Sequence, residues 1–356
     1  MERAVFHGRA AGTFPHSRWT ITSGGLDFSF GETLNGPVER ALISRRSDKT
    51  FGCWVDTAYV SRRVTVNRIV RKEVLSPSIF SFDVLAPEIA RHHRPGNFVV
   101  IRLSPTGERI PLTIASRDPD GGTVRIVFQA VGKTSSMLGD LNVGDRILDL
   151  VGPLGAATRI ARHDGAVVCV GGGLGIAPVL PIAAAHKEAG NRVITIIGAR
   201  SANLLMLAGE MEAASRELII TTDDGTSGRK GFVTEVLEEV IDRETPEGIS
   251  LVLAIGPVPM MAACCRVTAR YPIPTEVSLN PIMVDATGMC GACRVTVGGE
   301  TRFACVDGPE FDGHKVDFEE LGKRLRMYRE DELSAMKAYL DHTGPRCFEQ
   351  ERANGR

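Results

Sequence analysis

The sequence predicts an antiparallel β-barrel followed by an α/β domain with a parallel sheet, and then a hairpin loop rich in cysteine. Six short strand patterns separated by turn residues indicate the barrel, at residues 63–158. Strand and helix patterns then alternate over residues 159–280, which is typical of a parallel sheet covered on both faces. Residues 281–313 contain the cysteine-rich loop, and residues 314–356 read as a charged helical tail. Residues 1–62 show little sustained periodicity, so we expect either a disordered extension or a translation start assigned too far upstream.

The composition is that of an ordinary globular protein. The chain has 356 residues, of which 43% are hydrophobic and 24% charged, and this length allows two or three domains. The formal net charge of -1 gives no reason to expect binding to nucleic acid or to an anionic membrane. No apolar run approaches the roughly 20 residues that span a bilayer, and the first twenty residues lack the apolar segment of a secretory signal. Eight unevenly spaced cysteines then favour reduced thiols or metal ligands, so we expect a cytoplasmic protein.

The barrel strands are short runs with partial alternation of apolar and polar residues. Glycine, proline and aspartate separate them, as expected for turns. The six candidates are Val64–Val74, Ser78–Leu85, Asn97–Leu103, Ile110–Ala115, Thr123–Ala130 and Asp145–Leu150.

The α/β domain begins with a short apolar strand that should be buried on both faces. Four strands are expected, at Ala166–Val170, Arg192–Gly198, Glu217–Thr221 and Ser250–Ile255. Four helices are expected between and after them, at Val179–Ala189, Leu204–Arg216, Gly231–Ile241 and Met260–Arg270.

Three cysteines of the C-terminal loop are spaced as a metal site would need them. Cys290 and Cys293 are separated by two residues, which places two thiolates around one ion in a tight loop. Residues 294–297 and 301–304 read as the two strands of a hairpin, with Gly298 and Gly299 as the turn. The hairpin should bring Cys305 back beside the first pair, so the spacing predicts a metal or iron–sulfur site.

Asp285 occupies the first position of a plant-type Cys-x4-Cys-x2-Cys spacing, where it replaces cysteine. A carboxylate can ligate iron, so one aspartate with three cysteines could hold a [2Fe–2S] cluster. Two alternatives stay open: Asp285 could be a turn residue, and His314 could complete a zinc site with the three cysteines. The other cysteines are more often packing residues; they are Cys53, Cys169, Cys264, Cys265 and Cys347.

Two motifs on the predicted barrel favour a ligand that contains a ring system and phosphates. In the first, an arginine can hold a pyrophosphate oxygen, a proline fixes the backbone, and a threonine can bond a ring that lies on a leucine; the residues are Arg109, Pro111, Leu112 and Thr113. In the second, glycine and hydroxyl residues open a helix and can cradle a phosphate at Gly132, Lys133 and Thr134. In the first motif the arginine could instead be simply solvated, and the second motif could be a simple helix cap.

A glycine-rich turn between a buried strand and a helix predicts a second nucleotide site. Gly172, Gly173 and Gly175 let the backbone approach a pyrophosphate, although Pro178 departs from the usual Rossmann pattern. Arg200 follows the next strand and could favour a 2′-phosphate, or could only cap the strand end. Asp224 follows the third strand, where it could face the ligand or form a turn.

The order of these motifs resembles the ferredoxin–NADP reductase superfamily, in particular the electron-transfer subunits of dihydroorotate dehydrogenase and their relatives. The relatives include the small subunits of sulfide dehydrogenase and of NADH-dependent reduced ferredoxin:NADP+ oxidoreductase. The resemblance covers about residues 64–345. It implies that the barrel motifs bind FAD, that the glycine turn binds NAD(H) or NADP(H), and that Cys290, Cys293 and Cys305 bind a [2Fe–2S] cluster. Asp285, where the dihydroorotate subunit has cysteine, makes the chain more similar to the ferredoxin:NADP and sulfide dehydrogenase branch.

The resemblance implies an oxidoreductase subunit that passes a hydride from NAD(P)H to FAD and then single electrons to the cluster and a partner. No catalytic acid or base is expected, because hydride transfer needs none. The implied partner is a larger subunit with flavin and 4Fe–4S clusters, similar to the small subunit of glutamate synthase, and ferredoxin is a further candidate. One alternative is a dihydroorotate dehydrogenase subunit in pyrimidine biosynthesis. Another is a nucleotide-binding regulator held together by zinc.

Overall fold

The computed structural model describes residues 20–22, 25–27 and 66–343. The chain divides into two units, Met1–Val64 and Thr65–Arg356. In the first unit, β1 (Thr20–Thr22) and β2 (Gly25–Asp27) pair as a short antiparallel ribbon. The remainder of the expected 1–62 extension, together with Cys53 and Cys347, lies outside the described residues.

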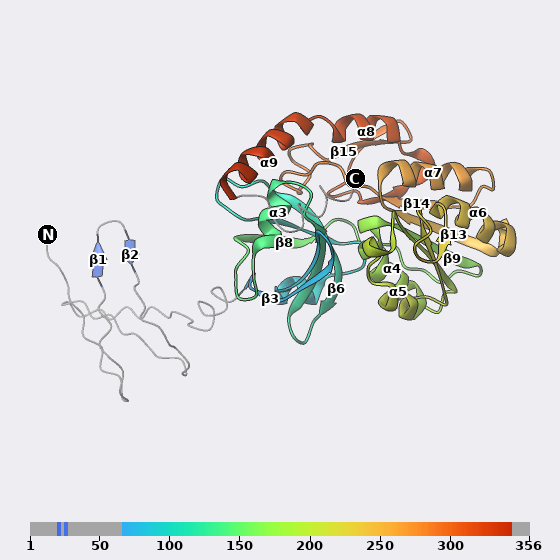
Figure 1. Cartoon of the computed structure of the whole chain (residues 1–356), viewed down its shortest axis with the longest axis horizontal. Coiled ribbons are helices and arrows are strands. Elements are labelled where there is room, and N and C mark those ends of the chain that lie inside the picture. The colour runs from blue at the N-terminus through green and yellow to red at the C-terminus, as the bar shows by residue number, and fades with distance from the viewer. Residues whose placement is uncertain (1–19, 23–24, 28–65, 344–356) are drawn as a thin grey trace, which may run out of the picture. The chain divides into compact units, whose positions relative to one another are not determined.

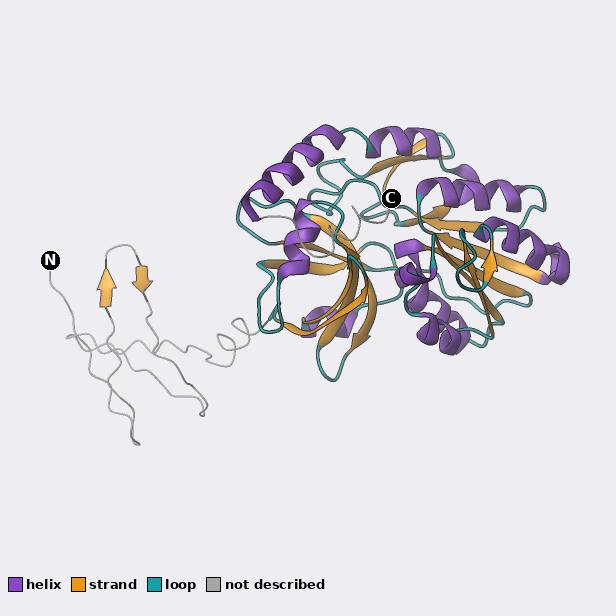
Figure 2. Ribbon diagram, in the orientation of Figure 1, coloured by secondary structure: helices purple, strands orange, loops and turns teal. Residues whose placement is uncertain are grey.

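The second unit begins with the predicted six-stranded antiparallel barrel (Figures 1 and 2). The spatial order is β3-β4-β7-β6-β5-β8. The strands are β3 (Ile69–Ser76), β4 (Ile79–Leu85), β5 (Phe98–Arg102), β6 (Ile110–Asp118), β7 (Thr123–Gln129) and β8 (Asp149–Leu154). A short helix, α2 (Pro87–His92), precedes β5. All six predicted strands are present, and the last begins four residues later than expected.

That shift has a structural cause, because the residues before β8 close the barrel. The Ile69 N–H donates to the Asp145 carbonyl at 2.9 Å, and the Ile147 N–H donates to the Asn67 carbonyl at 2.9 Å. These bonds join the start of the first strand to the segment that leads into the last. Closure satisfies backbone groups that an open sheet edge would leave unpaired.

The barrel interior is filled by large apolar side chains. Phe82 and Phe128 are fully buried and meet edge-to-face, with ring centroids 5.0 Å apart. Helix α3 (Lys133–Asp140) contributes the fully buried Leu138 to the same core. The helix that carries the predicted phosphate cradle is therefore anchored by barrel packing.

The α/β domain has a seven-stranded sheet in the order β12-β11-β10-β9-β13-β14-β17. The strands are β9 (Ala166–Gly172), β10 (Val193–Ala199), β11 (Glu217–Thr222), β12 (Arg229–Lys230), β13 (Ile249–Ile255), β14 (Thr275–Ser278) and β17 (Glu310–Asp312). All neighbours are parallel except β14 and β17. The strands β12, β14 and β17 were not predicted, because runs of two to four residues are recognised only where a turn signal such as Gly298-Gly299 joins them.

Helices cover both faces of this sheet (Figure 2). Helices α6 (Val233–Glu244) and α7 (Val258–Ala269) pack on one face. Helices α4 (Ile176–Glu188) and α5 (Ala208–Ala214) pack on the other, where they also meet the barrel residues Ile79, Ala115 and Val127. The predicted helix 204–216 begins only at Ala208, because Leu207 has a left-handed backbone with φ of 57°.

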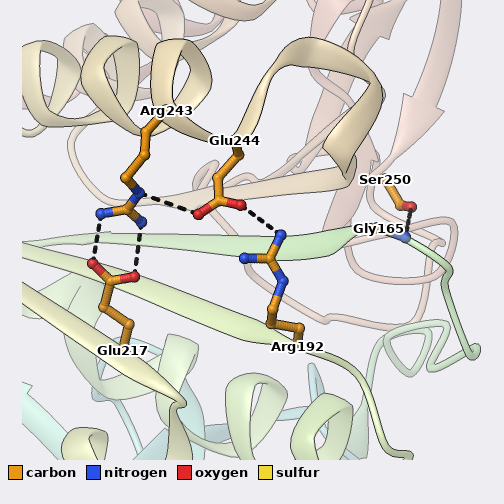
Figure 3. A network of polar contacts seen from close by, with 6 residues as sticks. All are labelled: Gly165, Arg192, Glu217, Arg243, Glu244 and Ser250. Atoms are coloured by element: carbon orange, nitrogen blue, oxygen red, sulfur yellow. Dashed lines mark hydrogen bonds and ion pairs between the residues drawn. The ribbon is translucent and has the colours of Figure 1, made fainter.

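A polar network lies at the amino ends of the sheet strands (Figure 3). Arg243, near the end of α6, binds both carboxylate oxygens of Glu217 at 2.7 and 2.8 Å. Glu244 bridges Arg243 and Arg192, and the Gly165 N–H donates to the Ser250 hydroxyl. This edge is thus used for structural contacts, which leaves the carboxyl ends of the strands for a ligand.

The cysteine-rich loop contains the predicted hairpin, β15 (Arg294–Val297) and β16 (Glu300–Phe303). Gly298 and Gly299 form its turn with φ of 62° and 80°, as a type I′ turn requires. The tail has two helices, α8 (Phe318–Leu325) and α9 (Arg329–Thr343). Helix α9 lies beside α3, where the Tyr339 hydroxyl donates to Asp140 at 2.6 Å (Figure 1). Among the described residues, no helix combines the length and apolar character needed to cross a bilayer.

Candidate functional site

The predicted ring-binding motif lies on β6, and its strand register decides which side chains face outward. Thr113 is opposite Phe98 on β5, and Pro111 is opposite Val100. Opposite residues of an antiparallel pair share one face of the sheet. Leu112 packs with the barrel core on the other face. Thr113 and Pro111 are therefore on the outer face, whereas Leu112 is not placed to support a ring with its side chain as we expected.

The backbone of the same motif has one unpaired edge. Among the described strands, residues Ile110–Thr113 of β6 pair with β5 alone, and β7 pairs with β6 from Ile114 onward. Pro111 is tolerated here because its missing N–H breaks no second ladder. The peptide groups along this edge are available to a polar ring.

The two barrel motifs meet through a side-chain hydrogen bond. The Thr134 hydroxyl donates to Glu108, the residue before Arg109, at 2.6 Å. At the start of α3 the Ser135 hydroxyl accepts the N–H groups of Val131 and Gly132, so part of this loop acts as a helix cap. Nothing lies within 4 Å of the position that a Cβ at Gly132 would occupy. Arg109, which follows Glu108, is exposed, and Lys133, which precedes Thr134, is half-buried. A pyrophosphate fits this open, basic arrangement.

The glycine-rich turn connects β9 to α4 through a short 3-10 helix, Gly173–Gly175. A Cβ added at Gly175 would overlap the carbonyl oxygen of Ile255, and one added at Gly172 would overlap the sulfur of Met260. Gly173 has φ of 54° and faces open space. Two glycines thus allow strand ends to pack closely, and the third leaves the N-terminus of α4 accessible, as a dinucleotide would require.

Arg200 and Asp224 are brought together at the carboxyl edge of the sheet. The Asp224 N–H donates to the Arg200 carbonyl at 3.2 Å. The Asp224 carboxylate accepts from the hydroxyl and the N–H of Thr226, and these bonds lower its pKa. Asp224 therefore has the contacts of a turn residue. The Arg200 side chain is exposed, and its role toward a ligand stays a prediction.

The four predicted cluster ligands share one loop. The sulfurs of Cys293 and Cys305 are 3.2 Å apart and buried, whereas Cys290 is exposed. Asp285 accepts the N–H of Thr287 at 2.9 Å and that of Cys290 at 2.8 Å, and the bond from Thr287 is the main reason its pKa is lowered. Within residues 66–343, no three His, Cys, Asp or Glu side chains are gathered closely enough to hold a metal ion.

The donor set nevertheless fits an iron–sulfur cluster, since thiolates with a carboxylate on one convergent loop are ligands that iron accepts. The loop backbone is held open by residues with positive φ, namely Ala286, Gly288 and Gly291. The zinc alternative loses its fourth ligand. His314 Nε2 is 2.9 Å from the Thr268 hydroxyl, on α7, so this histidine is engaged away from the cysteines.

One apolar cluster joins the cysteine loop to the barrel. Phe98 and Val100 of β5 pack with Cys293, Cys305 and their buried neighbours Met283, Ala286 and Ala304. These two β5 residues share a face with Thr113 and Pro111, so the cysteine loop covers the outer barrel face that carries the ring-binding motif. Further along β6, Ala115 belongs to the same apolar cluster as Ile176 at the start of α4. All three predicted sites thus border one strand.

Glu310 is a residue that sequence reasoning missed. Its carboxylate accepts the Thr158 hydroxyl at 2.7 Å, and burial, with a smaller contribution from Glu276, raises its pKa to about 7. An isolated glutamate in a loop of the sequence carries no pattern that would reveal such an environment. Only the pairing of β17 with β14 places it inside the protein.

Comparison with known proteins identifies two regions of the chain and its family. Residues 280–317 match the iron–sulfur cluster binding domain of dihydroorotate dehydrogenase B, and residues 169–266 match the oxidoreductase NAD-binding domain. A Thermotoga maritima homologue of the dihydroorotate dehydrogenase B (NAD+) electron-transfer subunit is 47% identical over 279 residues, which cover 78% of this chain and 97% of the relative. The chain belongs to the family of dihydroorotate dehydrogenase B electron-transfer subunits. The predicted family and the predicted class, an oxidoreductase subunit, are thereby confirmed.

Other members and solved structures agree with this family. A probable subunit of the same name from Methanopyrus kandleri is 32% identical over 238 residues, covering 67% of this chain and 86% of the relative. A chain from the structure of NADH-dependent reduced ferredoxin–NADP oxidoreductase, an enzyme of flavin-based electron bifurcation, is 47% identical with a TM-score of 0.73. It covers 77% of this chain and 98% of its own length. The predicted barrel, parallel-sheet domain and C-terminal cysteine loop are the fold of this family.

The close packing at the glycine turn gives a stability prediction. Gly175→Ala should destabilise the protein by about 1–3 kcal/mol, because the new methyl group overlaps the backbone of Ile255 in a packed interior. Gly209→Ala is the matched control, since nothing lies near its Cβ and alanine favours a helix. Urea unfolding measures both variants, and equal midpoints would contradict the close approach.

The buried carboxyl of Glu310 gives a pH prediction. Its pKa is about 7 in the folded protein and near the ordinary 4.5 when unfolded, so the folded state binds more protons between these values. The contribution of Glu310 to stability should therefore be greatest below pH 4.5 and decline as pH rises to 7. Glu310→Gln keeps the acceptor for Thr158 and should raise the melting temperature relative to wild type at pH 8 but not at pH 4.5. A pH-independent difference would contradict the assignment.

Proposed function

We propose that this chain takes electrons from a nicotinamide nucleotide and exports them singly to a partner subunit, by way of FAD and a [2Fe–2S] cluster. The observation that carries the proposal is the apolar cluster of Phe98, Val100, Cys293 and Cys305. It places the cysteine loop directly on the barrel face that bears the ring-binding motif. A short separation between the two groups is what electron transfer requires.

Three sets of residues would bind the three groups. Arg109 and Lys133 would bind the FAD pyrophosphate, and Thr113 with the free edge of β6 would bond the polar edge of its ring. The turn Gly172–Gly175 at the start of α4 would bind the nicotinamide pyrophosphate. The cluster would be held by Asp285, Cys290, Cys293 and Cys305. When bound, a flavin accepts the electron pair of a hydride and a [2Fe–2S] centre accepts one electron, so together they divide the pair.

The protein's own residues exclude water from the cysteine loop, orient its carboxylate and hold the two domains together. Phe98 and the buried side chains around Cys293 and Cys305 exclude water from one side of the cysteine loop. The N–H groups of Thr287 and Cys290 hold the Asp285 carboxylate in place. Arg125 on β7 binds both carboxylate oxygens of Glu210 on α5, which fixes the barrel against the nucleotide domain. No side chain has to act as acid or base.

We propose first that a larger partner subunit exists and then which kind of subunit it is. Members of an electron-transfer subunit family work with a larger subunit, and we propose the same here. A larger subunit that contains flavin and 4Fe–4S clusters fits the 47% identity to the ferredoxin–NADP oxidoreductase chain. A dihydroorotate dehydrogenase partner is the second candidate, favoured by the names of the curated relatives. The choice of NADH or NADPH, on which Arg200 should bear, and a cytoplasmic location stay predictions.

A visible spectrum with metal analysis tests the proposed function. Anaerobically purified protein should show flavin absorbance at roughly 450 nm and contain about two irons per chain without zinc. Cys305→Ser should lose the iron and keep the flavin. Cys264→Ala, which alters a buried thiol on α7, is the matched control and should keep both. Colourless, iron-free wild-type protein would refute the proposal.

A substitution at Asp285 tests its role as a ligand. Asp285→Cys should retain a cluster and lower its midpoint potential, because thiolate donates more charge to iron than carboxylate does. Asp307→Asn removes another carboxylate of the same loop, which accepts the Phe303 N–H, and should change the potential less. A redox titration compares the variants, and an unchanged potential in Asp285→Cys would exclude Asp285 as a ligand.

A further inference from the structure

The segment that follows Cys305 ties the cysteine loop to both other parts of the protein. The Ala156 N–H, at the exit of the barrel, donates to the Gly308 carbonyl at 2.7 Å. The Leu279 N–H, after β14, donates to the Pro309 carbonyl at 2.8 Å. Glu310 comes next and begins β17. It therefore occupies the point where barrel, parallel sheet and cysteine loop meet.

Within residues 66–343, the carboxyl of Glu310 has one hydrogen-bond donor, and it also has access to solvent. The Thr158 hydroxyl donates to its Oε1 at 2.7 Å. Glu310 also lines a cavity of about 180 Å³ together with Ala156, Arg159, Glu276 and Phe311. A cavity of this size admits water, so a proton can reach the carboxyl although most of it is buried.

The charged groups around Glu310 leave its charge without a direct cationic partner among the described residues. The negative charge of Glu276 on β14 repels the carboxylate of Glu310 and raises its pKa. The positive charges of Arg159 and His163 lower the pKa of Glu276, and the negative charge of Asp312 on β17 raises it. Burial raises the pKa of the Cys169 thiol on β9, and the charge of Glu310 adds a smaller effect in the same direction. With a pKa of about 7, the carboxyl is close to half-protonated at neutral pH, so a small change in nearby charge changes its protonation.

The next residue links this site to the cysteine loop. Phe311 packs against the apolar cluster that contains Cys293 and Cys305, and also against the core of the parallel sheet. Phe311 therefore connects the position of Glu310 to the apolar surroundings of the cysteines, while one side of it lines the same cavity as Glu310. Charges near an apolar interior interact more strongly than charges in solvent.

We propose that Glu310 takes up a proton when an electron reaches the cluster held by the cysteine loop, and releases it when the electron leaves for the partner. This inference rests on the proposed function. One electron enters through the flavin and one proton enters from water in the cavity. Both leave on oxidation, so charge balances and no covalent bond to substrate forms or breaks. Glu310 would act on the cluster through its charge, as a positioning residue that does not have to touch the cluster.

The test is the midpoint potential of the cluster as a function of pH, measured by anaerobic redox titration of the full chain with its cofactors. In wild type, the affinity for the electron should fall at least threefold between pH 6 and pH 8. In Glu310→Gln, which keeps the hydrogen bond to Thr158, the affinity should be independent of pH over this range. Glu300→Gln is the matched control: Glu300 is also five residues from Cys305, but it is exposed and paired with Arg302. It should keep the wild-type slope.

A second variant separates a proton-linked role from a merely structural one. The bond from Thr158 lowers the pKa of Glu310, so Thr158→Val should move the sloping region to higher pH without abolishing it. A flat wild-type profile, or an equal slope in Glu310→Gln, would overturn the inference while the cluster signal itself still upheld the proposed function. Protein without any cluster signal would instead refute the proposed function.

Discussion

The contact on which the rest of the site depends is the packing of Phe98 and Val100 against Cys293 and Cys305. It buries one side of the cysteine loop on the outer face of the barrel. Because side chains alternate along a strand, the same face necessarily carries Thr113 and Pro111. A single stretch of antiparallel pairing therefore decides that a ring bound at β6 and a cluster held by the loop would be neighbours.

The cysteine loop is held from its far end as well. It leaves the parallel sheet after β14 and returns to it as β17, so its two ends are fixed side by side by the β14–β17 pairing. Within the loop, the β15–β16 hairpin is extended by the Ala304 N–H, which donates to the Cys293 carbonyl at 3.1 Å. This arrangement explains why an acidic residue, Glu310, is drawn into the interior: it belongs to the strand that completes the sheet.

The α/β domain separates structural and ligand-binding tasks between the two edges of its sheet. Ion pairs of Arg243, Glu217, Glu244 and Arg192 lie at the amino ends of the strands (Figure 3). The carboxyl ends instead have close backbone packing at Gly175 and an accessible turn at Gly173. Backbone N–H groups at the start of α4 can bind a pyrophosphate, so the accessible turn at Gly173 suits the proposed site.

The sequence by itself determined the order of the parts, the hairpin with its Gly-Gly turn, and the positions of the barrel and glycine motifs. These depend on local periodicity and on turn residues, which act over a few positions. Only the tertiary structure decided that Leu112 faces the barrel core, that Asp224 has the contacts of a turn, and that His314 bonds Thr268 instead of joining the cysteines. It also decided that Glu310 is partly buried beside Thr158, 152 residues earlier in the chain. Strands of three residues, such as β17, have no period to read, and their burial depends on partners that are distant in sequence.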